Sequence, residues 1–414
     1  MNNTFKKNIF QNLGFIMQLF RRTKQFPKAF LSLSNVVKAN NYQLVYFDYK
    51  RMHDLISSEI AEEFSRIMSF RIEEDIERYL YLFEKAYQEY LKGGRCIATS
   101  SCTAAITFAL RLSGVKEGDE VIVPVNTYVA TALAVCDVGA RPIFVDVDET
   151  GLINCNLLEH ARTVNTKAII PVHLYGFPCN LDAIMAFAKK YSLYVIEDAA
   201  QAHGTLFRGE KVGTFGDFGC FSLHSSKLLG GLGNGGMLVV KNSAKAVHLA
   251  ALQNPYLNSS MTLKSKRTPD QLNPFNAALS WVKLKHLEEY IQRRIQIADT
   301  YTCFLSDIQE LDLSPRTEKY NRATYRSYVV QTKERDALKI YLFQKGIETK
   351  VFYQEPLHLM KTFEFLGYKK GDFPVAEMRA KKMLSLPTGP YLLDDEVRAV
   401  AKVIRYFYDK RIKR

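Results

Sequence analysis

Residues 193–227 read LYVIEDAAQAHGTLFRGEKVGTFGDFGCFSLHSSK, and this stretch contains two short apolar runs that each end in polar side chains. The first run ends at Glu197 and Asp198, and the second, Cys220–Leu223, is followed by Lys227. Short, nearly continuous apolar runs bounded by turn residues are typical of strands that are buried on both faces. The stretch therefore predicts two interior strands of a sheet.

The same pattern continues on both sides of this stretch. Further strands are predicted at Glu120–Pro124, Pro142–Val147, Ala168–His173 and Met237–Lys241, with helices at Thr103–Leu112, Tyr128–Val138 and Leu181–Lys190. Buried strands that alternate with helices predict an α/β fold with a mostly parallel central sheet and helices on both faces. Ligands of such folds bind beyond the carboxyl ends of the strands.

The remaining sequence predicts two further regions. Residues 255–275 are polar and read as an exposed loop, a long helix is expected over Asn276–Leu305, strands near Ser327–Gln331 and Glu348–Phe352, and a final helix from Asp394. We therefore divide the chain into a basic N-terminal extension (1–60), a large α/β domain (61–275), and a region with the long helix and a smaller C-terminal α+β domain (276–414).

Charge and composition exclude several classes of protein. The net charge is +13, and residues 1–60 contribute nine Lys and Arg against three acidic residues. No aromatic–basic signature accompanies these charges, so no nucleic-acid partner is expected. A basic surface suits an anionic substrate or an anionic membrane face, or it aids solubility. No apolar segment is long enough to span a membrane, and seven cysteines without paired or metal-ligand spacing indicate reduced thiols in the cytoplasm.

Two polar segments lie where a ligand of the sheet would bind. Residues 100–105, SSCTAA, form a small-residue turn that opens a helix, and free N–H groups at a helix N-terminus can hold a phosphate. Asp198, at the end of its strand, can pair with the protonated ring nitrogen of a pyridine cofactor. Each segment also has a plainer interpretation, that of an ordinary helix N-cap.

Lys227 directly follows a buried strand. Burial of an ammonium group is costly, lowers the pKa of the amine and frees it to form a Schiff base with an aldehyde. The hydroxyl of Ser222 can hold a phosphate beside it. A lone lysine is most often exposed, but in combination with Asp198 and the turn at Cys102 the functional interpretation is favoured.

Several longer segments together resemble one family, the DegT/StrS-like sugar aminotransferases. They are GDEVIVPVNTYVATALAV, AIIPVHLYGFPCNLDAI, VIEDAAQAHG, GTFGDFGCFSLHSSKLLGGLGNGGMLV and GDFPVAEMRAKKMLSLP, within residues 85–408. The resemblance implies a fold-type-I enzyme that uses pyridoxal 5′-phosphate (PLP). It also implies a homodimer that transfers an amino group, usually from glutamate, to a nucleotide-linked keto-sugar in amino-sugar or surface-polysaccharide biosynthesis.

The resemblance also implies roles for individual residues. Lys227 would form the Schiff base with PLP, Asp198 would pair with the ring nitrogen, and Tyr128 would stack on the ring. Cys102, Thr103 and Ser222 would bind the phosphate, Gln201 would lie near the ring oxygen, and His203 would support its neighbours.

The sequence departs from the family pattern in three places. The phosphate turn has Cys102 where glycine is usual. Pro269 stands where the family often has an asparagine that reaches the phosphate of the partner subunit, with Gln271 and Asn273 as the nearest replacements. Residues 1–60 have no counterpart. Within them, Phe5, Ile9, Leu13, Ile16 and Phe20 share one helical face, so residues 1–30 either associate weakly with a membrane surface or dock on the enzyme or its dimer partner.

Two other functions are compatible with the same fold. A PLP-dependent sugar dehydratase of the same family has histidine at the lysine position, so Lys227 argues against it. A PLP-binding regulator that has lost turnover is disfavoured by the presence of Lys227, Asp198 and Gln201.

Overall fold

The computed structural model describes residues 44–246, 270–317 and 321–412. Residues 44–412 belong to one compact unit. The amphipathic helix predicted within residues 1–30 and most of the predicted loop over 255–275, including Pro269, lie outside the described residues.

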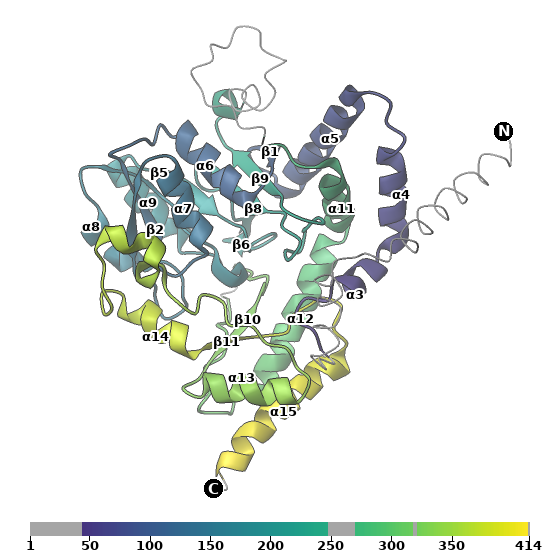
Figure 1. The fold of residues 1–414 in the computed structure, drawn as a ribbon, viewed down its shortest axis with the longest axis vertical. Coiled ribbons are helices and arrows are strands. Elements are labelled where there is room, and N and C mark those ends of the chain that lie inside the picture. The colour runs from purple at the N-terminus through teal and green to yellow at the C-terminus, as the bar shows by residue number, and fades with distance from the viewer. Residues whose placement is uncertain (1–43, 247–269, 318–320, 413–414) are drawn as a thin grey trace, which may run out of the picture. The chain divides into compact units, whose positions relative to one another are not determined.

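A seven-stranded sheet forms the centre of the fold, with the strand order β1-β9-β8-β5-β4-β2-β3 (Figure 1). The strands are β1 (Arg95–Thr99), β2 (Glu120–Pro124), β3 (Arg141–Val145), β4 (Thr166–Ile169), β5 (Tyr194–Asp198), β8 (Phe218–Ser222) and β9 (Gly236–Val240). All neighbours are parallel except β9, which runs antiparallel to both β8 and β1. The predicted mostly parallel sheet is confirmed.

Side chains alternate between the two faces of the sheet along each strand, and helices cover both faces. In β1, Ile97 packs in one core with the helices α6 (Cys102–Leu112) and α7 (Val129–Asp137), whereas Cys96 and Ala98 pack in another. That second core includes Tyr79, Phe83 and Tyr87 of α5 (Glu73–Leu91). The helix α9 (Leu181–Tyr191) covers the β2–β4–β5 side through Ile184 and Phe187. The sheet is therefore an interior layer, as its apolar strands require.

The long helix predicted over 276–305 is two helices, so this prediction was wrong. The helix α11 (Pro274–Lys285) ends at His286, whose φ of −101° and ψ of 3° are not helical, and α12 (Leu287–Leu305) follows. The apolar periodicity runs through His286 and conceals the break. The imidazole of His286 is held at 2.7 Å from Glu59 of α4 (Ser57–Ile67), which packs on α11.

The C-terminal region contains a two-stranded antiparallel sheet, β10 (Tyr328–Gln331) with β11 (Met383–Leu386). Its helices are α13 (Arg335–Gln344), α14 (Pro374–Lys382) and α15 (Asp394–Ile412). The strand predicted at 348–352 is absent, because Lys350 makes only an isolated bridge to Ser385 of β11 and no ladder forms. This prediction was also wrong.

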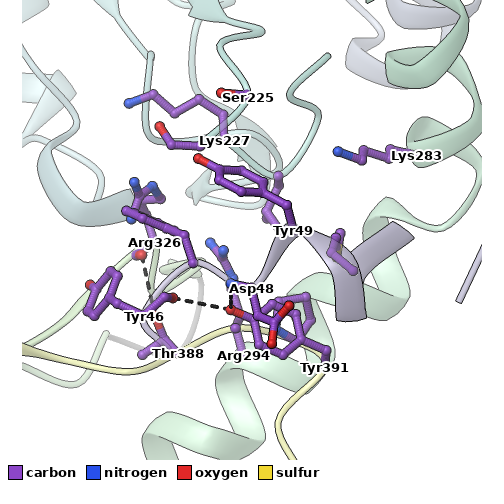
Figure 2. A pocket seen from close by; sticks show the side chains of 16 residues that line it. Tyr46, Asp48, Tyr49, Ser225, Lys227, Lys283, Arg294, Arg326, Thr388 and Tyr391 are labelled. Atoms are coloured by element: carbon purple, nitrogen blue, oxygen red, sulfur yellow. Dashed lines mark hydrogen bonds between the residues drawn. The ribbon is translucent and has the colours of Figure 1, made fainter. Parts of the chain in front are cut away.

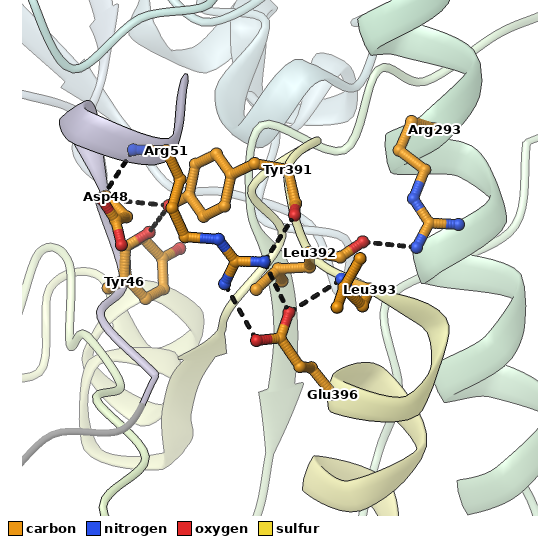
Figure 3. A network of polar contacts seen from close by, with 8 residues as sticks. All are labelled: Tyr46, Asp48, Arg51, Arg293, Tyr391, Leu392, Leu393 and Glu396. Atoms are coloured by element: carbon orange, nitrogen blue, oxygen red, sulfur yellow. Dashed lines mark hydrogen bonds and ion pairs between the residues drawn. The ribbon is translucent and has the colours of Figure 1, made fainter. Parts of the chain in front are cut away.

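Residues 44–60, which we assigned to the extension, pack within the body of the protein. Here α3 (Tyr49–Asp54) is tied to the start of α15 by a network of polar contacts (Figure 3). Both terminal nitrogens of Arg51 lie 2.9 Å from the carboxylate of Glu396, and one donates to the carbonyl of Tyr391. The Tyr391 hydroxyl accepts from the Asp48 N–H at 2.6 Å. The compact body thus begins at Leu44.

Candidate active site

Lys227 lies in the turn that follows β8. Its N–H donates to the carbonyl of His224 at 2.8 Å, and its carbonyl accepts from Gly230 at 3.0 Å, so the backbone of the turn is fixed. The side chain is partly buried, and no hydrogen bond of its amine is found among the described residues. Burial, and next the charge of Arg326, lower the pKa of the Lys227 amine to about 7. A large fraction of this amine is therefore neutral and nucleophilic near neutral pH.

Asp198 ends β5 and is 4% exposed. One carboxylate oxygen accepts from the Thr131 hydroxyl of α7 at 2.8 Å, and the other from the Ala200 N–H at 3.1 Å. Burial raises the pKa of Asp198, while these two hydrogen bonds and the charge of Lys227 oppose that effect. Each oxygen keeps a lone pair for a further donor, so the group is oriented and able to pair with a protonated ring nitrogen.

The neighbouring acid, Glu197, has a different role. It is fully buried and accepts backbone hydrogen bonds from Gly213, Phe215 and Gly216 at 2.7–2.8 Å. His173 lies 3.0 Å away, and because its Nδ1 accepts from the Cys179 N–H, its Nε2 donates to Glu197. These contacts hold the loop before β8 onto the end of β5. Glu197 is thus part of the scaffold that positions Asp198.

The predicted phosphate turn is the first turn of α6. The Ser101 hydroxyl caps the helix by accepting from the Ala104 N–H at 3.1 Å, whereas the N–H groups of Cys102 and Thr103 make no hydrogen bond among the described residues. Two free donors therefore remain at the positive end of the helix dipole. Burial raises the pKa of the Cys102 thiol well above its usual value, so the thiol adds no negative charge there.

Ser222 of β8 is brought near this turn because its neighbour strand, β9, packs against the start of α6. In the ladder between β8 and β9 it is opposite Gly236, and a Cβ on Gly236 would lie 2.4 Å from the Ser101 backbone. The absence of a side chain at Gly236 thus allows β9 to lie directly against the start of α6. The Ser222 carbonyl accepts from Nε2 of His203 at 2.8 Å.

His203 is buried and does not line the pocket beside Lys227. Its Nδ1 accepts from the Tyr87 hydroxyl at 2.8 Å, so both ring nitrogens have partners. Burial lowers the pKa of His203 to about 4, and the imidazole is neutral. This residue holds the end of β8 in place, in agreement with its expected supporting position.

Tyr128 and Gln201 complete the predicted set. Tyr128 precedes α7 and is 62% exposed, which leaves its ring available for stacking. The Gln201 amide is fixed at both ends, because it accepts from the Tyr175 N–H at 3.0 Å and donates to the Tyr353 hydroxyl at 2.6 Å. Tyr353 interacts electrostatically with Asp198, so the Gln201 amide that it holds lies near that carboxylate.

The sequence analysis missed several residues beside Lys227. Figure 2 shows the pocket next to this lysine, with Tyr46 and Tyr49 from the N-terminal segment, and Arg294 and Arg326 from α12 and the approach to β10. None of these residues belongs to a motif with a recognisable spacing. Only the conjunction of segments far apart in the chain brings them together.

Comparison with known proteins places this arrangement in a family. Residues 54–405 match the DegT/DnrJ/EryC1/StrS aminotransferase family. The chain belongs to this family. A dTDP-3-amino-3,4,6-trideoxy-alpha-D-glucose transaminase of Streptomyces venezuelae is 32% identical over 379 residues, 90% of this chain and 98% of the relative. A UDP-N-acetyl-3-dehydro-alpha-D-glucosamine 3-aminotransferase of Acidithiobacillus ferrooxidans is 38% identical over 315 residues, 75% and 83% of the two chains.

Solved structures of the DegT/DnrJ/EryC1/StrS family have the same fold. The structure of S. venezuelae DesV in complex with a ketimine intermediate superimposes with a TM-score of 0.83 at 32% identity, over 88% of this chain and 98% of DesV. The family match confirms the resemblance seen in the sequence, and with it the predicted fold class and aminotransferase activity. Among the described helices, none combines the length and apolar character needed to cross a bilayer.

Proposed function

We propose that this protein binds PLP and transfers an amino group from an amino acid, with glutamate as the expected donor, to a nucleotide-linked keto-sugar. The observation that carries the proposal is the position of Lys227. Its amine has a pKa of about 7, interacts electrostatically with Asp198, and lies near Cys102 at the first turn of α6. An amine, an oriented carboxylate and an anion-binding turn are the three groups that an aldehyde-bearing pyridine phosphate requires.

The residues present fit PLP in the following way. Lys227 would bind its aldehyde carbon, and Asp198 would hold its ring nitrogen protonated. The N–H groups of Cys102 and Thr103, with the Ser222 hydroxyl, would bind its phosphate. Tyr128 would stack on the ring and Gln201 would lie near its ring oxygen. When bound, PLP supplies an electron-withdrawing ring that stabilises negative charge at the substrate carbon attached to nitrogen.

The protein's own residues would do the rest of the chemistry. The Lys227 amine would act as the base and acid that moves a proton at the substrate carbon attached to nitrogen. A pKa of about 7 suits both tasks near neutral pH, because the amine gains and loses a proton with similar ease. Asp198 would keep its charge through the Thr131 and Ala200 hydrogen bonds.

The expected acceptor is a sugar linked to a nucleoside diphosphate. Two relatives that are named for dTDP- and UDP-linked amino-sugars support this class, and both names refer to position 3 of the sugar. The intermediate in the DesV complex supports imine chemistry on the same fold. We further propose a cytoplasmic homodimer in which residues 1–30 either dock on the enzyme or its dimer partner or associate weakly with a membrane surface. We also propose the three regions predicted from the sequence, except that the compact body begins at Leu44.

Covalent trapping tests the proposed role of Lys227. Borohydride reduction of the PLP-loaded protein should attach the cofactor to the peptide that contains Lys227 and to no other peptide. Lys227→Ala should bind PLP without being labelled and should not catalyse the reaction. Lys241→Ala should behave as the wild type, because Lys241 lies at the end of β9 opposite to Gly236. Labelling of another lysine, together with an active Lys227→Ala variant, would refute the assignment.

A further inference from the structure

The pocket beside Lys227 gathers an excess of positive charge. Lys227, Lys283, Arg294 and Arg326 line it, and Asp48 is the one acidic residue among its lining residues (Figure 2). The Asp48 carboxylate already caps α3 by accepting from the Arg51 N–H at 3.0 Å. Within the described part of the chain, the pocket therefore has cations without matching anions.

Arg294 illustrates this imbalance most clearly. It is 6% exposed, and its Nε and Nη1 atoms are buried without a hydrogen-bond partner among the described residues. No ion pair to a described carboxylate is found for it. Burial, and next the charge of Arg326, lower the pKa of Arg294 to about 9. A buried guanidinium with unused donors is expensive to maintain unless an anion binds to it.

Arg326 is arranged in a similar way. It is 6% exposed, its Nε is buried without a partner, and the one side-chain hydrogen bond found for it among the described residues is a 3.3 Å contact from Nη1 to the Ser327 hydroxyl. Its guanidinium carbon lies 4.8 Å from the ring centre of Phe47 and 5.7 Å from that of Phe352. The two rings lie close to the guanidinium, and its unused N–H donors remain for a planar anion.

The other cations of the pocket are placed differently. Lys283 is buried and donates to the Gly230 carbonyl at 2.6 Å, so it holds the turn that follows Lys227. The remaining titratable groups that line the pocket are Tyr46, Tyr49 and Tyr391. The Tyr46 hydroxyl contacts Ser327 at 3.1 Å, and the Tyr391 hydroxyl is held by Asp48. Apart from the Lys227 amine, which the proposed function assigns to the cofactor, the two arginines are the cations of the pocket whose donors are unused among the described residues.

The size of the pocket is compatible with a carboxylate. Its cavity volume is about 40 Å³, and by this measure one water needs roughly 10–15 Å³. The cavity therefore has room for a group of a few heavy atoms. The forked donors of arginine also match the two coplanar oxygens of a carboxylate.

We propose that Arg294 and Arg326 bind a carboxylate of the amino-acid donor in this pocket. The inference rests on the proposed aminotransferase function, because the donor must be held close to Lys227 for its amine to react. It adds two substrate-binding residues from α12 and from the approach to β10.

Binding of glutarate, a dicarboxylate that has no amine to react, tests the proposal. Calorimetry on the PLP-loaded full-length protein should show glutarate binding about ten- to a hundredfold more weakly in Arg294→Gln and Arg326→Gln, the effect of losing a hydrogen bond between charged groups. Arg398→Gln, an exposed arginine of α15, is the matched control and should bind as the wild type does. UDP binding should be unchanged in all three variants.

The alternative outcomes are distinct. Weaker UDP binding with unchanged glutarate binding would show that the arginines bind the nucleotide diphosphate, and unchanged binding of both ligands would show that they bind neither; each result overturns the proposal. If Arg326→Gln does not fold, Arg326→Lys keeps the charge without the fork and should still lose part of the glutarate affinity. If the wild-type protein has no transaminase activity and the arginine variants still lose glutarate binding, the carboxylate site is upheld and the proposed function is rejected.

Discussion

Lys227 should capture PLP at a pH at which ordinary lysines do not react. With a pKa of about 7, half of its amine is neutral at pH 7, whereas a lysine with the ordinary pKa of 10.5 has about one neutral amine in 3,000. The concentration of the reactive form is thus raised by about three orders of magnitude. The rate of Schiff-base formation, followed by absorbance after PLP is added to apoprotein, should rise with pH around a midpoint of about 7.

Two variants and one stability measurement sharpen this prediction. Arg326→Gln should raise the midpoint, because the charge of Arg326 lowers the pKa of Lys227, and Arg398→Gln should leave it unchanged. Since the pKa of Lys227 is lower in the folded than in the unfolded protein, the unfolded state binds more protons between pH 7 and 10.5. The free energy of unfolding of the apoprotein should therefore rise with pH in that window, and less so in Lys227→Met. A capture midpoint near 10 would refute the reasoning.

Three further changes have defined expectations. Asp198→Asn should fold, as judged by circular dichroism, but lose two to three orders of magnitude in turnover, about 3–4 kcal/mol, because a neutral amide does not hold the ring nitrogen protonated; turnover near that of the wild type would indicate that Asp198 is only an N-cap. Glu197→Gln should lower the free energy of unfolding in urea by about 3–5 kcal/mol, since the amide nitrogen would face backbone donors; the exposed Glu159→Gln is the control, and equal stability of the two variants would contradict the scaffold role. Removal of residues 1–43 should leave PLP bound in spectra of the purified protein. Removal of residues 1–55 should weaken glutarate binding, because it deletes the pocket wall formed by residues 46–52. Equal glutarate binding by the two truncated proteins would contradict this role of the wall.

Most of the large domain could be predicted from the sequence, because its signals are local. The predicted strand at Glu120–Pro124 agrees with the structure at both ends, and the predicted helix at 181–190 is one residue shorter than α9. Each has an apolar pattern whose period matches its geometry. The failures occurred where a local pattern was misleading. The apolar periodicity continues through the helix break at His286. The segment at 348–352 has a strand-like pattern but makes only an isolated bridge to β11.

The site was predictable to the extent that its residues lie in contiguous motifs. Lys227 and Asp198 each follow a recognisable strand, and the structure brings them together with the start of α6. Arg294 and Arg326 carry no such signal. An arginine within an amphipathic helix, or before a short strand, is ordinarily solvated, and its burial depends on contacts with residues more than two hundred positions away.

The bond between Arg51 and Glu396 joins residues 345 positions apart, and this separation has a consequence for biosynthesis. The wall of the pocket formed by residues 46–52 is fastened to the beginning of α15, which leaves the ribosome after the whole sheet. The sheet and the turn around Lys227 consist of residues 95–240 and can fold while translation continues. The framework around Lys227 can therefore form before the pocket wall at residues 46–52 is fastened by its contact with α15.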